Sequence, residues 1–196
     1  MHSISVIICV NNQKYELKKT LETLKKQTVT PAEIIVVDES GSSDVYDYIK
    51  NLVDEKVNYV RAKAEDGIIL SEKDLFEVGA KRSIGEYITF AQLGDEWDSK
   101  RIEILSNALD SETDLDLIVH SYSLRVSLAD EIFTANDKQN NFDCLFHFWT
   151  EKSSAIIKKN LFLSKIHPTY PKLLRKTHYC FLNTFLYYHQ YSYLHQ

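Results

Sequence analysis

The feature that most constrains this fold is an alternation between short apolar runs and segments of helical period. Ser5–Val10 and Ile34–Val37 are apolar and rich in β-branched residues, and Tyr15–Gln27 between them carries leucines at intervals of four and three residues. Such leucine spacing places an apolar stripe on one face of a helix. Short β-branched runs that alternate with helices are typical of a strand, helix, parallel strand unit. The chain is therefore expected to form an α/β sheet.

The alternation continues along the chain without a linker that would divide it. Further helices are expected over residues 42–53, 71–85, 98–109 and 177–188, and further strands over 57–62, 86–90 and 115–121. Residues 57–62 are less apolar than the other runs, which places that strand nearer an edge. With 5 Gly and 3 Pro, the sequence offers no linker composition. A single domain over residues 1–196 is expected, a length that can enclose a substantial core.

Polar residues follow the strands at the points where the strands end. Asn11 and Asn12 follow the first run, Asp38 and Glu39 the second, and residues 91–97 follow the strand expected at 86–90. Ligands of open parallel sheets bind beyond the carboxyl ends of the strands. These side chains are therefore expected at one ligand-binding edge.

Three stretches carry a family resemblance. SVIICVNN at 5–12, LETLKKQT at 21–28 and IIVVDESGS at 34–42 resemble the opening of family-2 glycosyltransferases. The resemblance implies the GT-A fold, a Rossmann-like, mostly parallel sheet with helices on both faces. It further implies a nucleotide-binding half over about residues 1–110 and an acceptor-side half over about 111–196.

The same resemblance implies an activity and a set of partners. Family members transfer a sugar, with inversion, from a nucleotide-diphospho-sugar such as a UDP-sugar to a glycan or lipid-linked acceptor in polysaccharide synthesis. The positions it assigns to nucleotide binding are Val10, Asn12, Asp38, Glu39, Asp66, Gln92 and Asp95.

Each of the polar positions also has a plainer interpretation. Asp38 could be a solvated turn residue, Asn12 a helix cap, and Asp66 an exposed loop acid. Asp95 could cap the helix that starts near residue 98, and Trp97 is expected in the core rather than as a sugar platform. These alternatives stay open at the level of sequence.

The metal-binding motif of the family is altered in this chain. A leaving diphosphate gathers negative charge, which Mg²⁺ or Mn²⁺ held by carboxylates stabilises. The two aspartates of the family's Asp-x-Asp motif fall on Gln92 and Gly94, so Asp95 is the one candidate metal ligand. Weaker metal binding is expected, and a cation is not assumed. Phe76 likewise stands where the family has an arginine before its Asn-x-Gly, here Glu77-Val-Gly79.

The catalytic base is altered as well. An inverting transfer needs a group that deprotonates the acceptor hydroxyl as it attacks. The family uses the aspartate of a Glu-Asp-Tyr triplet at the start of a late helix, and this chain has Thr177-His178-Tyr179 there. His178 is the candidate base, since an imidazole titrates near neutral pH. The alternative is that the base has been lost.

These departures leave two function hypotheses. The first is an inverting glycosyltransferase, and the second is an inactive GT-A pseudoenzyme that binds or scaffolds a partner. A flavodoxin-like or response-regulator-like domain shares the alternating pattern but gains little support, because no phosphate-cradling glycine loop is present in the sequence.

Composition limits the partners and the compartment. The net charge of −5 argues against nucleic acid as a ligand. Three widely spaced cysteines predict neither a disulfide framework nor a metal site. The sequence shows no signal peptide and no run of about 18 apolar residues. A cytoplasmic protein is expected, with the inner face of the membrane as the alternative, and a second copy or a partner glycosyltransferase as candidate protein partners.

Overall fold

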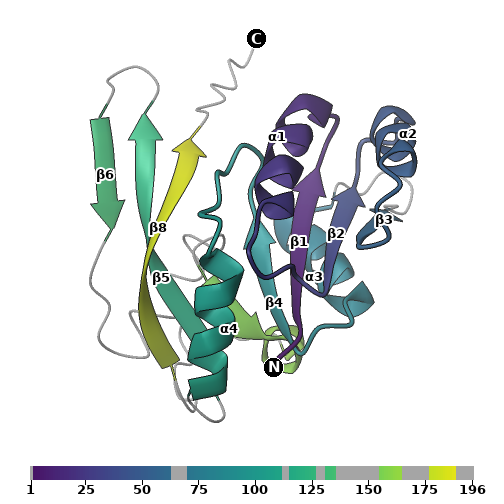
Figure 1. Cartoon of the computed structure of the whole chain (residues 1–196). Helices are drawn as coiled ribbons and strands as arrows, with labels where there is room; N and C mark the ends of the chain where they lie inside the picture. The colour runs from purple at the N-terminus through teal and green to yellow at the C-terminus, as the bar shows by residue number, and fades with distance from the viewer. Residues whose placement is uncertain are drawn as a thin grey trace.

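The computed structural model describes residues 2–62, 70–111, 115–126, 131–135, 155–164 and 177–188. Its first half alternates strands and helices (Figure 1): β1 (Ile4–Val10), α1 (Lys14–Lys25), β2 (Glu33–Asp38), α2 (Asp44–Asn51), β3 (Val57–Arg61), α3 (Glu72–Arg82), β4 (Tyr87–Ala91) and α4 (Arg101–Ser111). The second half contains β5 (Leu117–Val126), β6 (Glu131–Ala135), β7 (Ala155–Lys158), α6 (Lys159–Leu163) and β8 (Thr177–Tyr188). None of the helices in these ranges has the length and apolar character needed to cross a membrane.

In the described part of the chain the strands form one eight-stranded sheet in the order β3-β2-β1-β4-β7-β5-β6, and β8 pairs with β5. The first four strands are parallel to one another. β7 runs antiparallel to both β4 and β5, whereas β8 is parallel to β5. The expected α/β fold with a mostly parallel sheet is confirmed, and β3 lies at the edge where its weaker hydrophobicity placed it.

Both faces of the parallel part are covered by helices. Alternate residues of β1 point to opposite faces: Val6 and Ile8 pack with α1, α2 and α4, whereas Ile7 packs with α3. A Cβ at Gly79 of α3 would lie 2.5 Å from the Ile7 side chain, so only glycine lets this helix approach the sheet so closely. Burial of both faces explains why the strands are continuously apolar.

One predicted helix is a strand in the structure. Residues 177–188 were expected to form a helix and instead form β8, which pairs with β5 from Leu117↔Thr177 to Val126↔Tyr188, with a shift of register between His120 and Tyr122. The segment is rich in Thr, Tyr and Phe, which are residue types that favour strands. The spacing of its apolar residues is the one feature that matches a helix. The long pairing with β5 therefore decides for a strand over the helix that the spacing predicted.

The amino ends of the strands are joined by a buried carboxylate. Glu33 Oε1 accepts hydrogen bonds from Ser5 Oγ at 2.7 Å and from the Ile84 N–H at 2.6 Å. Its Oε2 accepts from Asn58 Nδ2 at 2.9 Å. Glu33 is only 4% exposed, so these donors replace water and link β1, β2, β3 and the approach to β4.

Candidate functional site

The connections of the sheet define where a ligand crevice forms. α1 and α2 lead from β1 to β2 and β3 on one face, and α3 then returns the chain to β4 on the other side of β1 and over the opposite face (Figure 1). The direction of winding thus reverses between β1 and β4. In open α/β sheets this switch point, at the carboxyl ends of the strands, is where ligands bind. Asn12 follows β1 and Gln92 follows β4 at that edge.

The loop after β1 presents an exposed amide at this edge. Asn12 is exposed and adopts a left-handed backbone with φ of 64°, a conformation that asparagine tolerates better than most residues. The residue that caps α1 is Gln13 and makes no side-chain cap bond, so the structure does not use Asn12 as the cap. Asn12 therefore stays available to a ligand.

The loops after β1 and β2 are tied to each other. Asn11 Nδ2 donates to Glu39 Oε1 at 3.2 Å, and the Glu39 N–H donates to the Val10 carbonyl at 3.1 Å. The Val10 side chain itself is 2% exposed and belongs to the core. Val10 can thus meet a ligand through its backbone only, while Glu39 is partly exposed beside Asn11.

Asp38 lies behind the edge rather than on it. Its carboxylate accepts a hydrogen bond from Tyr59 Oη at 2.7 Å and another from the Ser40 N–H at 2.9 Å. Burial, followed by this hydrogen bond to Asp38, raises the pKa of Tyr59 to about 12. Asp38 is 0% exposed, so it is not a solvated turn residue and offers no surface to a ligand in this conformation. Its observed role is to shape the 39–44 loop, and its contact with a nucleoside stays a prediction.

The loop between β4 and α4 is built on a buried charge pair. Asp95 is 1% exposed, and its Oδ2 accepts from the Gln92 N–H at 3.0 Å. Arg101 is fully buried; burial lowers its pKa to about 9, and the negative charge of Asp95 opposes that shift. The Arg101 Nη2 also donates to Thr89 Oγ1 at 3.3 Å. Asp95 therefore faces an internal cation and does not cap α4, which begins at Arg101.

These residues do not fit a resident divalent cation. The Asp95 carboxylate is buried and already engaged, and Gln92 and Gly94 supply no charged oxygen. Within the described residues there is no group of three His, Cys, Asp or Glu side chains that could hold a metal. Phe76 is buried against Phe90, with ring centroids 4.4 Å apart, so that position brings no positive charge to a diphosphate.

Two predicted positions, Asp66 and His178, are left to consider. Asp66 lies outside the described residues. His178 is in β8, where its backbone pairs with Ile118, and Ile118 and Thr89 both pair with Ile156 of β7. Its backbone is thus three inter-strand spacings, about 14 Å, from Thr89 in the middle of β4. The structure does not bring His178 to the same edge as Asn12 and Gln92.

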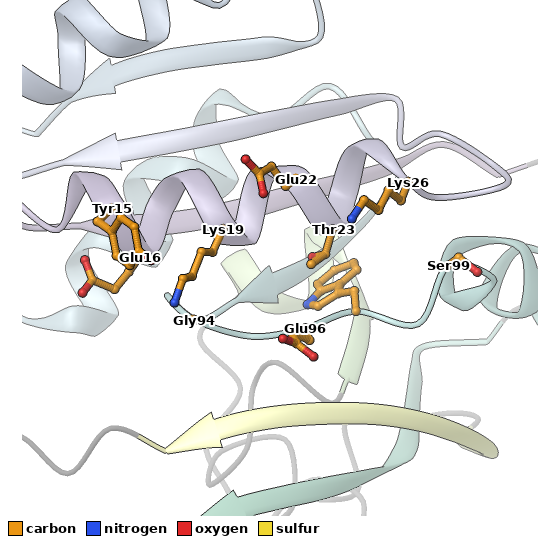
Figure 2. Close-up of a pocket in the computed structure, with 10 residues that line it drawn as sticks. Tyr15, Glu16, Lys19, Glu22, Thr23, Lys26, Gly94, Glu96 and Ser99 are labelled. Atoms are coloured by element: carbon orange, nitrogen blue, oxygen red, sulfur yellow. The ribbon is translucent and has the colours of Figure 1, made fainter. Parts of the chain in front are cut away.

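A cavity of about 770 Å³ lies beside this edge, between α1 and the β4–α4 loop (Figure 2). We call it the α1 groove. Its lining residues are Tyr15, Glu16, Lys19, Glu22, Thr23, Lys26, Gly94, Glu96, Trp97 and Ser99. Trp97 is 5% exposed, which confirms its expected place in the core.

Sequence reasoning missed two features of this region, the buried Arg101 and the α1 groove. Arg101 could have been found from its spacing, because it precedes Leu105 and Leu109 by four and eight residues and so shares their buried face. The groove depends on how a helix and a loop lie against each other, which the sequence pattern does not describe.

Comparison with known proteins gives a consistent result. The family model described as "Glycosyl transferase family 2" matches residues 5–124. A glucosyltransferase of Escherichia coli, the UDP-Glc:alpha-D-GlcNAc-diphosphoundecaprenol beta-1,3-glucosyltransferase WfaP, is 25% identical over 112 residues, which are 57% of this chain and 43% of that protein.

Solved structures of S. aureus TarS 1–349 share the fold. The complex with UDP has a TM-score of 0.67 at 15% identity, and the match covers 95% of this chain and 60% of the TarS 1–349 chain. The complex with UDP-GlcNAc has a TM-score of 0.68 at 15% identity, covering 96% and 59%. This chain therefore spans less than two thirds of the length of these relatives.

Proposed function

The chain belongs to glycosyl transferase family 2, and we propose that it transfers a sugar, with inversion, from a nucleotide-diphospho-sugar to a glycan or lipid-linked acceptor. A UDP-sugar is the proposed donor, because TarS structures hold UDP and UDP-GlcNAc and the name of WfaP specifies UDP-Glc. The lipid-diphosphate acceptor in the name of WfaP supports a role in polysaccharide synthesis, in the cytoplasm or at the inner face of the membrane.

The observation that carries this proposal is the switch point between β1 and β4. The two strands are paired from Ile4↔Tyr87 to Ile8↔Ala91, so the loops that follow them begin side by side. One loop presents the exposed Asn12 and the other the partly exposed Gln92. Amide side chains both donate and accept hydrogen bonds, which suits a nucleoside and its ribose.

We propose that the donor binds without a resident cation. The Asp95 Oδ2 accepts a hydrogen bond from the Gln92 N–H, and the charge of this buried carboxylate acts on Arg101. The loop that would otherwise be ordered by a metal is thus already ordered. Sugar transfer still needs a base, and His178 remains the proposed one. In this role the His178 imidazole must come within hydrogen-bond distance of the acceptor hydroxyl.

The second candidate function is a nucleotide-binding domain that does not catalyse transfer. The specific observation in its favour is the register of β8, which places the His178 backbone about 14 Å from Thr89 across the sheet. In that case the chain would act as a binding or scaffolding partner, for a second copy or for another glycosyltransferase.

Calorimetric titration with UDP, with Mn²⁺ or with EDTA, tests the donor site. We expect saturable UDP binding in both conditions, about tenfold weaker in Gln92→Ala, where two hydrogen-bonding groups are lost, and unchanged in the exposed control Lys100→Ala. Absence of UDP binding in both conditions would refute the proposal. Release of UDP from UDP-Glc or UDP-GlcNAc then separates the two candidates: turnover that His178→Ala removes, with UDP binding intact, supports the transferase.

A further inference from the structure

The α1 groove is formed by a face of α1 that the core does not use. The buried stripe of that helix contains Leu17, Leu21 and Leu24. The groove is lined instead by Tyr15, Lys19, Thr23 and Lys26, which repeat at intervals of three to four residues on a different face (Figure 2). The opposite wall is the loop from Gly94 to Ser99.

The two walls are fixed to each other by hydrogen bonds along the length of the groove. The Gly94 N–H donates to Thr20 Oγ1 at 3.0 Å, near the start of the loop. Gln27 Nε2 donates to the Asp98 carbonyl at 2.7 Å, and the Thr28 N–H donates to the Ser99 carbonyl at 2.8 Å. A ligand would therefore enter a groove that is already shaped, which lowers the ordering cost of binding.

Trp97 brings an indole ring to the wall of the groove. The residue lines the groove and is 5% exposed, and its Nε1–H is buried and has no hydrogen-bond partner among the described residues. Because this nitrogen is buried, a ligand in the groove meets the ring rather than the donor. The indole N–H is therefore a reporter of the groove and not one of its contacts.

The charges of the lining select the class of ligand. Glu16, Glu22 and Glu96 contribute three carboxylates, while Lys19 and Lys26 contribute two ammonium groups. An anion such as a nucleoside diphosphate would meet more like charges than opposite ones. An uncharged polyol fits better, because each hydroxyl can donate to a carboxylate and accept from an ammonium group. Lys19 Nζ lies over the Tyr15 ring, 4.5 Å from its centroid, and the rest of this 65% exposed ring can meet the apolar side of such a ligand.

We propose that the α1 groove is a binding site for an uncharged oligosaccharide, separate from the nucleotide edge. The groove begins at Gly94, in the loop that carries Gln92, and at Tyr15, just after Asn12, so its end adjoins the donor site. From this position the groove holds sugar units of the oligosaccharide that are remote from the unit that reacts. The biological role rests on the proposed function, whereas binding itself does not.

Two-dimensional NMR of the indole N–H groups tests this site directly. The chain has 2 tryptophans, so the spectrum contains two indole signals, and Trp97→Phe assigns one of them. The probes are tetramers of glucose with different linkages and of N-acetylglucosamine, with tetragalacturonate as the charged comparison and UDP in a parallel titration. We expect a neutral tetramer to shift the Trp97 signal saturably, and tetragalacturonate and UDP to leave it in place.

A charge-neutral double variant locates the binding. Lys19→Ala/Glu22→Ala removes one exposed cation and one exposed anion from the groove, and Lys18→Ala/Glu55→Ala removes the same pair of charges from exposed positions outside it. We expect the first to weaken tetramer binding by about tenfold and the second to leave it unchanged.

Three outcomes would overturn the inference: no neutral tetramer shifts the Trp97 signal, the charged probes shift it equally, or the groove variant binds as tightly as the control. The parallel UDP titration keeps this failure distinct from failure of the donor site. Retained UDP binding without saccharide binding overturns the groove alone. Saccharide binding without UDP binding overturns the transferase proposal and supports the groove.

Discussion

The guanidinium carbon of Arg101 lies 3.5 Å from the centroid of the Trp97 ring. This contact places a fully buried cation against an aromatic face inside the β4–α4 loop, with the charge of Asp95 acting on it from the same loop. A buried cation–π contact of this kind is worth about 2 kcal/mol when it is desolvated. The loop beside the donor edge is thus held by groups of the protein itself.

Arg101→Met is expected to destabilise the protein by about 3–5 kcal/mol, because it leaves the buried Asp95 without its compensating charge. Asp95→Asn should also destabilise, and the double variant should lose less than the sum of the two. Urea unfolding of all three gives the coupling free energy, expected at about 1–3 kcal/mol. The exposed neighbour Lys100→Met serves as the control. Additive losses would show that the two charges are not coupled.

Glu33→Ala is expected to lower the free energy of unfolding by about 3 kcal/mol, because Ser5, Asn58 and the Ile84 N–H lose their shared acceptor. Asn58→Ala, which removes a single donor, should cost about 1 kcal/mol. Both can be measured by urea unfolding. Glu33 lies at the amino end of β2, opposite the donor edge, so UDP affinity should stay unchanged at a temperature where the variant is folded. A loss of UDP affinity under those conditions would contradict this separation.

The elements that could be predicted from the sequence are those whose pattern lies within a few neighbouring residues. Strands β1 and β2 and helix α1 were predictable because Val6–Val10, Ile34–Val37 and the leucines of α1 carry their periodicity within a few residues. The capping box of α3 was equally local, since Ser71 and Asp74 lie three residues apart. β8 was mistaken for a helix because its pairing with β5 lies some sixty residues away in sequence.

The site was less predictable than the fold, for a different physical reason. The residues after β1, β2 and β4 could be assigned to one edge, because parallel strands end together. The direction in which each side chain points could not be assigned in this way. The Asp38 carboxylate accepts a hydrogen bond from Tyr59 of the neighbouring strand, and the charge of Asp95 acts on the buried Arg101. The sequence around each aspartate does not describe these interactions. A motif aspartate in sequence therefore does not by itself establish an exposed carboxylate.

The hydrogen bond between Tyr59 and Asp38 should make stability depend on alkaline pH. The pKa of Tyr59 is raised from 10.0 to about 12 in the folded state, so its contribution is fully present below pH 10 and is lost as pH rises through about 12. Tyr59→Phe should therefore be less stable than wild type at neutral pH, with the difference shrinking above about pH 10. Urea midpoints of both proteins across this range give the comparison, with the exposed Tyr15→Phe as control. A pH-independent difference would refute the linkage.

Gln92→Asp should make UDP binding depend on a divalent cation. Gln92 is partly exposed at the carboxyl end of β4, whereas Asp95 is buried, so a carboxylate at position 92 is the one that a cation and a diphosphate can reach together. Hard carboxylate and phosphate oxygens are the ligands that Mg²⁺ and Mn²⁺ prefer. In EDTA the new charge should repel the diphosphate and weaken UDP binding by about tenfold, and Mn²⁺ should restore it. Calorimetry of wild type, Gln92→Asp and the neutral Gln92→Asn measures both effects. If wild type needs Mn²⁺ as strongly as Gln92→Asp does, the protein already holds a cation at this edge, and the internal pairing of Asp95 with Arg101 does not replace it.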